Sequence, residues 1–331
     1  MHETITRELT FGEAVKEAIA EEMRRDSRVF LLGEDVAEAG TPFKVLSGLV
    51  EEFGTQRIVD TPIAEAGFAG LAVGAAMTGL RPIVDIMFGD FITLTMDQMV
   101  NQAAKIHYMS GGHWRCPMVM RTTLGAGRRS AAQHSQSLHA WFSHVPGLKV
   151  VLPSTPYDAK GLLKTAIRDE NPVVFFEDKM TYKLKGPVPT GEYTIPFGVA
   201  DVKRVGSDIT IVATSSMVQV ALAAADMLEA AGISAEVIDP RTTWPLDEKA
   251  LIESAIKTSR VIVVDEGYER YGVTAEIAAV IAEGAFFNLD APVKRIGAMH
   301  VPIPFSPPLE DATVPSEKLV FEAARKLCDN T

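Results

Sequence analysis

The chain is poor in cysteine, with two in 331 residues, Cys116 and Cys328. Their wide separation matches no metal-ligand spacing, which argues against a cysteine-based zinc site. Their scarcity favours a reducing, cytoplasmic compartment. Long apolar runs are also missing, and the first residues contain no apolar signal core, so neither a membrane span nor a secretory signal is predicted.

An excess of positive charge is absent as well. The net charge of −11 argues against nucleic acid or an anionic membrane as the main partner, although it permits a basic protein partner. The share of apolar residues, 47%, is that of an ordinary soluble chain. At this length we expect two domains, each large enough to bury its own core.

Apolar segments of strand length alternate with helical segments along the first half of the chain. The predicted strands are residues 29–33, 82–87, 118–121, 148–152 and 173–176, and the predicted helices are 11–25, 96–107 and 157–168. This alternation predicts a doubly wound α/β domain, with a parallel sheet covered by helices on both faces.

A stretch rich in Pro, Gly and Lys at about residues 183–200 is the predicted linker. After it the alternation resumes, with predicted strands at 209–213, 235–238, 261–265 and 293–296 and predicted helices at 218–231 and 274–283. The sequence therefore predicts two domains, residues 1–190 and a smaller α/β domain of residues 191–331.

Glu65 is a carboxylate in an otherwise small and apolar segment, and the next charged residue is Arg81. A helix with so many glycines and alanines is expected to be buried, and a buried carboxylate without an adjacent cation is costly and tends to stay protonated. The structural alternative is a helix start, with Thr61 as the N-cap, Pro62 at the first position and Glu65 favoured by the helix dipole. Both interpretations remain open at this level.

His134 lies in the polar cluster Gln133-His134-Ser135-Gln136. Because ligand contacts favour loops, His134 is a candidate acid, base or oxyanion partner, and a loop histidine bonded to its neighbours is the alternative. Ser135 lacks the Gly-x-Ser-x-Gly elbow of a hydrolase nucleophile. His139 and His144, each five residues further on, do not share a helix face as zinc ligands would.

The loop before this cluster contains Gly125, Gly127 and the pair Arg128-Arg129. Its amides and guanidinium groups could bind an anion, but a salt-bridged surface turn is the favoured interpretation. No Gly-x-Gly-x-x-Gly follows the first strand, so no nicotinamide cofactor is predicted there. The acids of the second domain are expected to be solvated; they include Asp247, Glu248, Glu253, Asp265, Glu266, Glu269, Glu310 and Asp311.

Several longer motifs occur together along essentially the whole chain. They are Leu32-Gly33-Glu34-Asp35-Val36, Asp60-Thr61-Pro62-Ile63-Ala64-Glu65-Ala66-Gly67-Phe68, Gly79-Leu80-Arg81-Pro82, Tyr108-Met109-Ser110-Gly111-Gly112, Ala132-Gln133-His134-Ser135-Gln136 and Phe305-Ser306-Pro307. In these motifs the chain resembles the β subunit of the thiamine-diphosphate-dependent 2-oxo acid dehydrogenases, the decarboxylating first component of those complexes. The resemblance implies a pyrimidine-binding α/β domain and a transketolase-like C-terminal α/β domain.

Within that family the chain is most similar to the acetoin dehydrogenase β subunit. The segments that carry this likeness include Arg128-Arg129, Trp141-Phe142 and Tyr193-Thr194-Ile195-Pro196. Because the pyruvate and branched-chain enzymes share most of the other motifs, all three substrates remain open.

The resemblance implies thiamine diphosphate as the cofactor and gives Glu65 a partner, the pyrimidine ring nitrogen, in a contact that activates the cofactor. Met87 and Phe91 match positions that pack around the pyrimidine. His134 matches a histidine near the reacting carbon that steers proton transfers and acyl transfer to lipoamide. Positions around a structural potassium ion, bound mostly through backbone carbonyls, are matched by Met118, Ala166, Ile167, Asp169 and Asn171.

The family's motif for diphosphate and magnesium, Gly-Asp-Gly followed by Asn-Asn, is absent. Gly89-Asp90-Phe91 lacks the second glycine, and no Asn-Asn pair occurs in the chain. Since magnesium needs oxygen ligands and shares the phosphates, the resemblance implies that an α subunit holds both. The expected assembly is an α2β2 heterotetramer with shared cofactor, in which this chain is inactive alone.

The resemblance also implies a lipoyl acyltransferase core as a partner, docked on the C-terminal domain. A docking subunit without catalysis and a self-sufficient transketolase-like homodimer are the alternatives, and the missing motif argues against the homodimer. Gly70 and Gly74, four residues apart, suit either a subunit contact or a tightly packed core helix.

Overall fold

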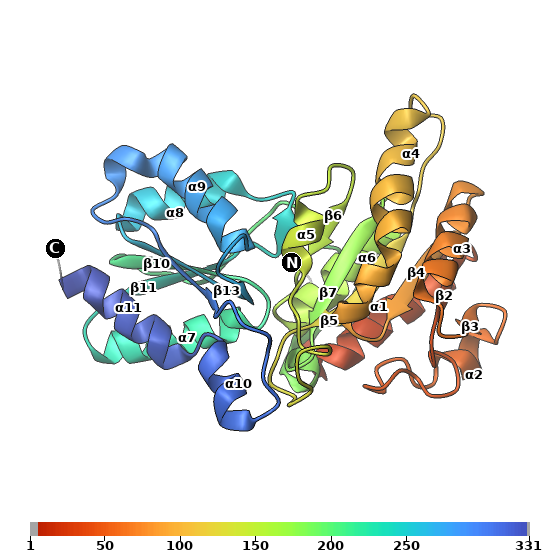
Figure 1. Cartoon of the computed structure of the whole chain (residues 1–331), viewed down its shortest axis with the longest axis horizontal. Helices are drawn as coiled ribbons and strands as arrows, with labels where there is room; N and C mark the ends of the chain where they lie inside the picture. The colour runs from red at the N-terminus through yellow and green to blue at the C-terminus, as the bar shows by residue number, and fades with distance from the viewer. Residues whose placement is uncertain (1–5, 330–331) are drawn as a thin grey trace. The chain divides into compact units, whose positions relative to one another are not determined.

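The computed structural model describes residues 6–329, which form two compact units. Unit 1 comprises the chain up to Leu124 together with Trp141–Phe197, and unit 2 comprises Gly125–Ala140 and the chain from Gly198 onwards. Each unit contains a largely parallel sheet with helices on both faces (Figure 1), which confirms the predicted α/β class.

The sheet of unit 1 has the strand order β6-β7-β5-β4-β2-β3, and these neighbours are parallel. The strands are β2 (Val29–Gly33), β3 (Ile58–Asp60), β4 (Arg81–Ile86), β5 (Val119–Leu124), β6 (Lys149–Val151) and β7 (Val173–Asp178). Their largely apolar sequences follow from burial on both faces. Because the strands are parallel, their carboxyl ends share one edge, where open α/β sheets bind ligands.

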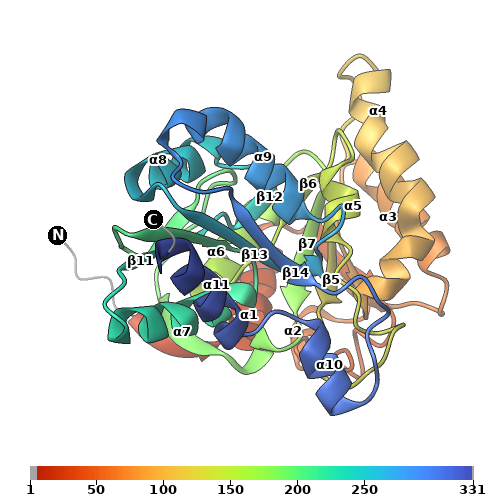
Figure 2. The same cartoon turned by 60° about the vertical axis from the view of Figure 1, so that its left-hand side comes forward.

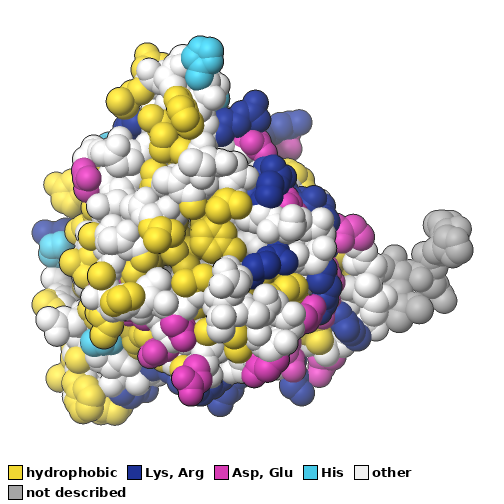
Figure 3. All heavy atoms as spheres, turned by 90° about the vertical axis from the view of Figure 1, so that its right-hand side faces the viewer, with side chains coloured by type: hydrophobic (Ala, Val, Ile, Leu, Met, Phe, Trp, Pro, Cys, Tyr) yellow, Lys and Arg dark blue, Asp and Glu magenta, His cyan; other side chains and the backbone are white. Residues whose placement is uncertain are grey.

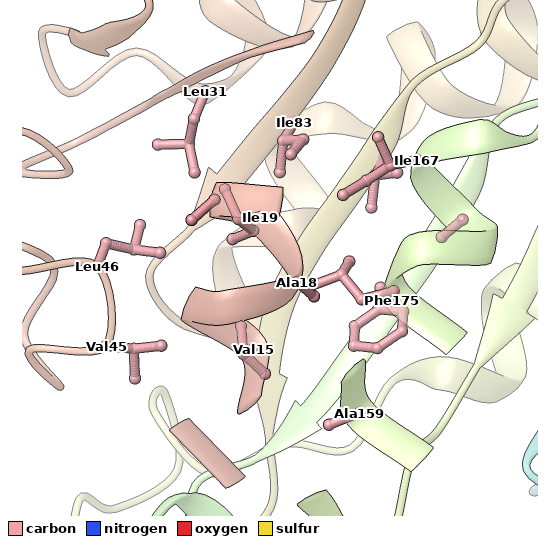
Figure 4. Packing of buried hydrophobic residues seen from close by; sticks show 14 of the residues in the cluster. Val15, Ala18, Ile19, Leu31, Val45, Leu46, Ile83, Ala159, Ile167 and Phe175 are labelled. Atoms are coloured by element: carbon pink, nitrogen blue, oxygen red, sulfur yellow. The ribbon is translucent and has the colours of Figure 1, made fainter. Parts of the chain in front are cut away.

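Helices cover both faces of this sheet. One face is packed against α1 (Phe11–Arg25) and α6 (Pro156–Arg168). Figure 4 shows Val15, Ala18 and Ile19 of α1 among the strand residues Leu31, Ile83 and Phe175. The other face carries α3 (Glu65–Met77), the 3-10 helix η1 (Gly89–Thr95), the π-helix η2 (Asp97–Ala103) and α4 (Ala104–Met109). The predicted helix at 96–107 is therefore a π-helix continued by an α-helix.

Unit 2 has the strand order β14-β13-β10-β11-β9, in which only the β9–β11 pairing is antiparallel among the described residues. The strands are β9 (Asp201–Arg204), β10 (Ile209–Ala213), β11 (Ala235–Asp239), β13 (Val261–Tyr268) and β14 (Lys294–Ala298). One face packs against α7 (Met217–Ala230) and α11 (Glu317–Asp329), and the other against α8 (Glu248–Thr258) and α9 (Val273–Ala285) (Figure 2).

The predicted linker is partly a strand. β8 (Lys185–Pro189) pairs antiparallel with β1 (Thr6–Thr10). The Pro and Gly content of this segment indicated coil. The strand could not be recognised in the sequence, because its partner β1 lies far away near the start of the chain. A two-stranded ribbon tolerates proline, since each strand has an open edge that needs no donor.

Helix α3 is buried on one side only. Phe68 and Ala72 are buried, but Leu71 is 58% exposed and Gly74 is exposed too. The expectation of a buried helix is therefore wrong for the side of α3 that carries Leu71 and Gly74. Figure 3 shows apolar side chains on this side of the molecule. A Cβ added at Gly74 would meet no atom within 4 Å, so packing inside this chain gives no reason for glycine there.

In the part of the chain that the structure describes, no helix combines the length and the apolar character needed to cross a bilayer. Cys116 and Cys328 are both free thiols.

Candidate active site

Acidic residues gather at the carboxyl edge of the unit 1 sheet. Glu34 directly follows β2, Asp85 is near the end of β4, and Glu65 begins α3 after the turn that follows β3. Glu34 and Glu65 are each 7% exposed, and Asp85 is 4% exposed. Since β3, β2 and β4 are neighbours, parallel pairing brings three buried carboxyl groups to one place.

The acidity of Glu34 is strongly perturbed. Burial, and after it repulsion from the Glu65 carboxylate, raises the pKa of Glu34 to about 7. Its Oε1 atom is buried and has no hydrogen-bond partner among residues 6–329. The same is true of the hydroxyl of Thr61, which follows the adjacent strand β3. A side chain at Gly33 would collide with the backbone of β4, because its Cβ would lie 2.6 Å from the Asp85 carbonyl oxygen.

Glu65 is the first residue of α3, and Ala64 is its N-cap, without a side-chain hydrogen bond. The interpretation of Thr61 as N-cap and Pro62 as first helical residue is therefore wrong: the Thr61 hydroxyl is buried and the helix begins later. No described residue forms a hydrogen bond or ion pair with the Glu65 carboxylate. A carboxylate in the first turn still suits the helix dipole.

Met87 and Phe91 lie at the same edge of the sheet. Met87 follows β4, and its carbonyl oxygen accepts a hydrogen bond from Thr123 Oγ1 at 3.1 Å. Phe91, in η1, packs against the apolar cluster of this face and meets Phe88 edge to face with ring centroids 6.3 Å apart. The structure thus brings Glu65, Met87 and Phe91 to one edge.

These groups fit an aminopyrimidine ring. Neither the Glu34 Oε1 atom nor the Glu65 carboxylate has a donor among residues 6–329, and such groups are costly when buried. A flat ring with a protonatable nitrogen and an amino group supplies those partners. The half-buried side chains of Met87 and Phe91 offer the apolar contacts that its faces need.

A buried ion cluster lies on the strands next to this edge. Arg121 of β5 donates from Nε and Nη2 to Glu177 of β7, at 2.9 and 2.7 Å, and from Nη1 to Asp85 of β4. Burial raises the pKa of Asp85 to about 6, although Arg121 opposes the shift. We did not predict this cluster, yet its signal was present: Asp85 and Arg121 are charged residues inside otherwise apolar strands.

The residues matched to a potassium site contribute carbonyls near the carboxyl end of α6. The carbonyl oxygens of Ile167 and Asp169 converge on Nη1 of Arg81, at 3.1 and 3.0 Å. A guanidinium therefore stands where two of the candidate ligands meet. Each carbonyl keeps a second lone pair, so a cation would have to share these oxygens with Arg81.

The remaining candidate ligands have hydrogen-bond partners of their own. The carbonyl of Ala166 accepts from the Asp169 N–H at 3.3 Å, and that of Met118 accepts from the Val173 N–H at 3.0 Å. The Asn171 N–H donates to Asp169 Oδ1 at 2.9 Å. The carbonyls of Ala166 and Met118 therefore already have donors, and the set fits a potassium ion only partly.

His134 belongs to unit 2, in the segment Gly125–Ala140 that leaves β5 of unit 1. Nη1 of Arg129 lies 2.7 Å from Glu310 Oε2 and 2.6 Å from Asp311 Oδ1. The interpretation of this loop as a salt-bridged turn is confirmed for Arg129.

Two acids that were expected to be solvated are buried. Asp265 is 2% exposed and Glu310 is fully buried. The expectation is wrong for them because each carboxylate accepts hydrogen bonds inside unit 2; for Asp265 one donor is the Gly267 N–H, at 2.7 Å. Burial alone would raise the pKa of Asp265, but His139 and the hydrogen bonds outweigh it, and the pKa lies below its ordinary value.

Comparisons with known proteins identify the two domains and the family. Residues 7–185 match the family model of the transketolase pyrimidine-binding domain, and residues 198–320 match that of the transketolase C-terminal domain. The chain is 51% identical to the β subunit of acetoin:2,6-dichlorophenolindophenol oxidoreductase from Bacillus subtilis, covering 98% of each chain. The chain belongs to the β subunits of the thiamine-diphosphate-dependent 2-oxo acid dehydrogenase family.

Other β subunits of this family are about as similar. The chain is 49% identical to the 2-oxoisovalerate dehydrogenase subunit β of Bacillus subtilis, covering 97% of this chain and 99% of that one. It is 50% identical to the pyruvate dehydrogenase E1 component subunit β of Rickettsia felis, covering 97% and 98%. A solved split-gene transketolase, described as an inactive β4 tetramer, has the same fold, with a TM-score of 0.79 over 97% of this chain and 98% of its own, at 24% identity.

The raised pKa of Glu34 predicts a pH dependence of stability. Between its ordinary value near 4.5 and about 7, the folded state holds a proton that the unfolded chain releases, so stability falls as pH rises through this window. Glu34→Gln removes this contribution. We expect a flatter dependence of the urea midpoint on pH in that window, with a residual slope from Asp85. Glu38→Gln, at an exposed position, is the control and should keep the wild-type slope. Equal slopes in Glu34→Gln and wild type would contradict the assignment.

Proposed function

We propose that this chain is the β subunit of the thiamine-diphosphate-dependent component of an acetoin dehydrogenase complex. With an α subunit it would cleave acetoin and pass the two-carbon acyl unit to lipoamide. The observation that carries its catalytic part is the pair of buried carboxyl groups, Glu34 and Glu65, which lack donors from the described chain and lie on the domain that matches pyrimidine binding. The acetoin-specific segments and the 51% identity to an acetoin oxidoreductase β subunit support the substrate.

Glu65 is proposed to share a proton with the pyrimidine ring nitrogen. Thiamine diphosphate, when bound, would supply a carbon acid whose deprotonated form can add to the carbonyl carbon of the substrate. The low-dielectric position of Glu65 strengthens its hydrogen bond and favours proton sharing over solvation. Glu34 titrates near neutrality, so it can hold or release a proton beside Glu65. Met87 and Phe91 hold the ring and exclude water.

His134 is proposed to steer the proton transfers at the reacting carbon and the acyl transfer to lipoamide. A histidine suits this role because its unperturbed pKa lies in the physiological range. Its polar loop also carries Gln133 and Gln136, which could orient a bound substrate.

The rest of the cofactor site is proposed to come from an α subunit. The missing Gly-Asp-Gly and Asn-Asn motif supports this, since this chain then lacks the ligands for diphosphate and magnesium. The exposed face of α3 at Leu71 and Gly74 supports a subunit contact, because no described residue of unit 1 covers it. An α2β2 heterotetramer follows, with a lipoyl acyltransferase core docked on the C-terminal unit.

A second candidate is the β subunit of a pyruvate or branched-chain 2-oxo acid dehydrogenase. It is favoured by identities of 50% and 49% to β subunits of those enzymes. The chemistry assigned to Glu65 is the same for all of these substrates.

Reconstitution tests the split site. We expect the isolated chain to be inactive and to gain activity with its α partner and thiamine diphosphate. Glu65→Gln should lower kcat about 10²–10⁴-fold, the usual contribution of a positioned proton-transfer group, without changing the far-UV circular dichroism. Glu51→Gln, at an exposed position of α2 (Leu49–Phe53), is the matched control. A fully active isolated chain would contradict the split site, and a fully active Glu65→Gln assembly would contradict the role of Glu65.

The substrate is tested by side-by-side assays of the reconstituted assembly. Acetoin, pyruvate and 2-oxoisovalerate would each be supplied with a lipoamide acceptor, and we expect kcat/KM to be highest for acetoin. A higher kcat/KM for either 2-oxo acid would transfer the assignment to the second candidate, while leaving the Glu65 test unaffected.

Potassium binding is tested through stability. An ion that binds only the folded chain raises its thermal midpoint by mass action. If the carbonyls near α6 hold potassium beside Arg81, the midpoint should be higher in potassium chloride than in sodium or choline chloride of equal ionic strength. Equal midpoints in all three salts would show that Arg81 alone satisfies these carbonyls.

A further inference from the structure

The segment that carries His134 is fastened at both of its ends to one strand of unit 2. Near its start, the Ala126 N–H donates to Glu266 Oε1 at 2.7 Å. At its end, His139 Nε2 lies 3.1 Å from Asp265 Oδ2. Asp265 and Glu266 are consecutive residues of β13, so the two ends of the segment Gly125–Ala140 are brought together there.

A third carboxylate holds the turn before His134. The Gly127 N–H donates to Glu310 Oε1 at 2.7 Å, while Arg129 Nη1 contacts Glu310 Oε2 at 2.7 Å. Glu310 belongs to α10 (Pro307–Thr313) and is fully buried. Its two oxygens therefore bind a backbone amide and a guanidinium of the same turn, and charge-assisted bonds of this kind are stronger than neutral ones.

The Asp265 carboxylate is held in one orientation by its own neighbours. Thr214 Oγ1 donates to Oδ1, and the Gly267 N–H donates to Oδ2 at 2.7 Å. A Cβ at Gly267 would lie 2.5 Å from Asp265 Oδ2 and 3.2 Å from His139 Cε1, so this contact tolerates no side chain there. The position of His139 is thus set by a rigid acceptor.

The backbone of the segment needs such support. Arg129 and Ala131 have φ values of +57° and +61°, in the left-handed region that residues with a Cβ rarely adopt. Strained residues of this kind persist only where the surrounding structure holds them, and they concentrate at functional sites. Both lie within five residues of His134 in sequence.

We propose that Asp265, Glu266 and Glu310 are positioning residues that hold this segment, and with it His134, in the conformation used in the reaction. The inference rests on the proposed role of His134. It assigns three of the acids of the C-terminal domain to internal positioning, so they are not part of a surface for docking a basic partner.

The test is hydrogen exchange of peptides covering residues 125–140 in the reconstituted assembly, together with steady-state kinetics. Glu310→Ala removes the acceptors of Gly127 and Arg129, so exchange there should rise about tenfold or more, as expected for losing bonds to a buried charge. We expect kcat to fall by about the same factor while KM changes little, because ground-state binding is left intact. Glu310→Gln keeps an oxygen that can accept from the Gly127 N–H. Its exchange rate and its kcat should therefore lie between those of the wild type and of Glu310→Ala.

Two further variants distinguish local loosening of residues 125–140 from instability of the whole protein. Arg129→Gln changes a side chain that is 35% exposed and removes the same ion pair, so it should loosen the segment even if Glu310→Ala fails to fold. Glu283→Gln, at an exposed position of α9, is the control and should change neither exchange nor kcat. Unchanged exchange at residues 125–140 in Arg129→Gln and in the folded Glu310 variants would overturn the proposal.

His134→Ala separates this inference from the proposed function. If it keeps full activity while the Glu310 and Arg129 variants loosen the segment, the role of His134 fails and the proposed positioning of His134 fails with it. If it loses activity while the segment stays protected in those variants, the role of His134 stands and the positioning by Glu310 is overturned.

Discussion

The burial of two carboxyl groups without a bonded cation is the constraint on which the rest of unit 1 depends. Glu34 and Glu65 stand at the carboxyl ends of neighbouring strands, each 7% exposed, and no described residue bonds to the Glu34 Oε1 atom or to the Glu65 carboxylate. Burial of this kind is costly unless a partner arrives. Three features place the two groups at this edge of the sheet: the parallel strand order, the absence of a side chain at Gly33, and the start of α3 at Glu65 instead of Pro62. In the proposed function, the donors of a bound ligand would offset this cost.

The acids of unit 2 serve a different purpose. There each buried carboxylate meets a donor from the same unit: Asp265 meets His139 and a backbone amide, and Glu310 meets Arg129 and another amide. Satisfied charges of this type fix conformation, whereas the carboxylates of Glu34 and Glu65 have no donor among residues 6–329. This contrast is the basis for proposing a cofactor-binding role for the acids of unit 1 and a positioning role for those of unit 2.

Much of the fold could be predicted from the sequence, because the apolar strands of a doubly covered parallel sheet leave a clear pattern. The strand β8 could not be predicted, since its Pro- and Gly-rich sequence pairs with a distant partner. Glu65 stood out as a lone charge in an apolar segment, and Asp85 and Arg121 carry the same signal inside strands. Asp265 ends the predicted apolar strand 261–265 and carries that signal as well. The burial of Glu310 left no such mark, because it depends on where the turn with Arg129 folds back.

The central claim is that the Glu65 carboxylate meets the pyrimidine ring of thiamine diphosphate. It is tested most directly by the experimental structure of this chain assembled with its α subunit and the cofactor. The account predicts a Glu65 carboxylate oxygen within about 2.6–3.2 Å of the pyrimidine ring nitrogen, the range of a hydrogen bond. A Glu65 carboxylate paired instead with a lysine or arginine of the partner, with the ring bound elsewhere, would contradict it.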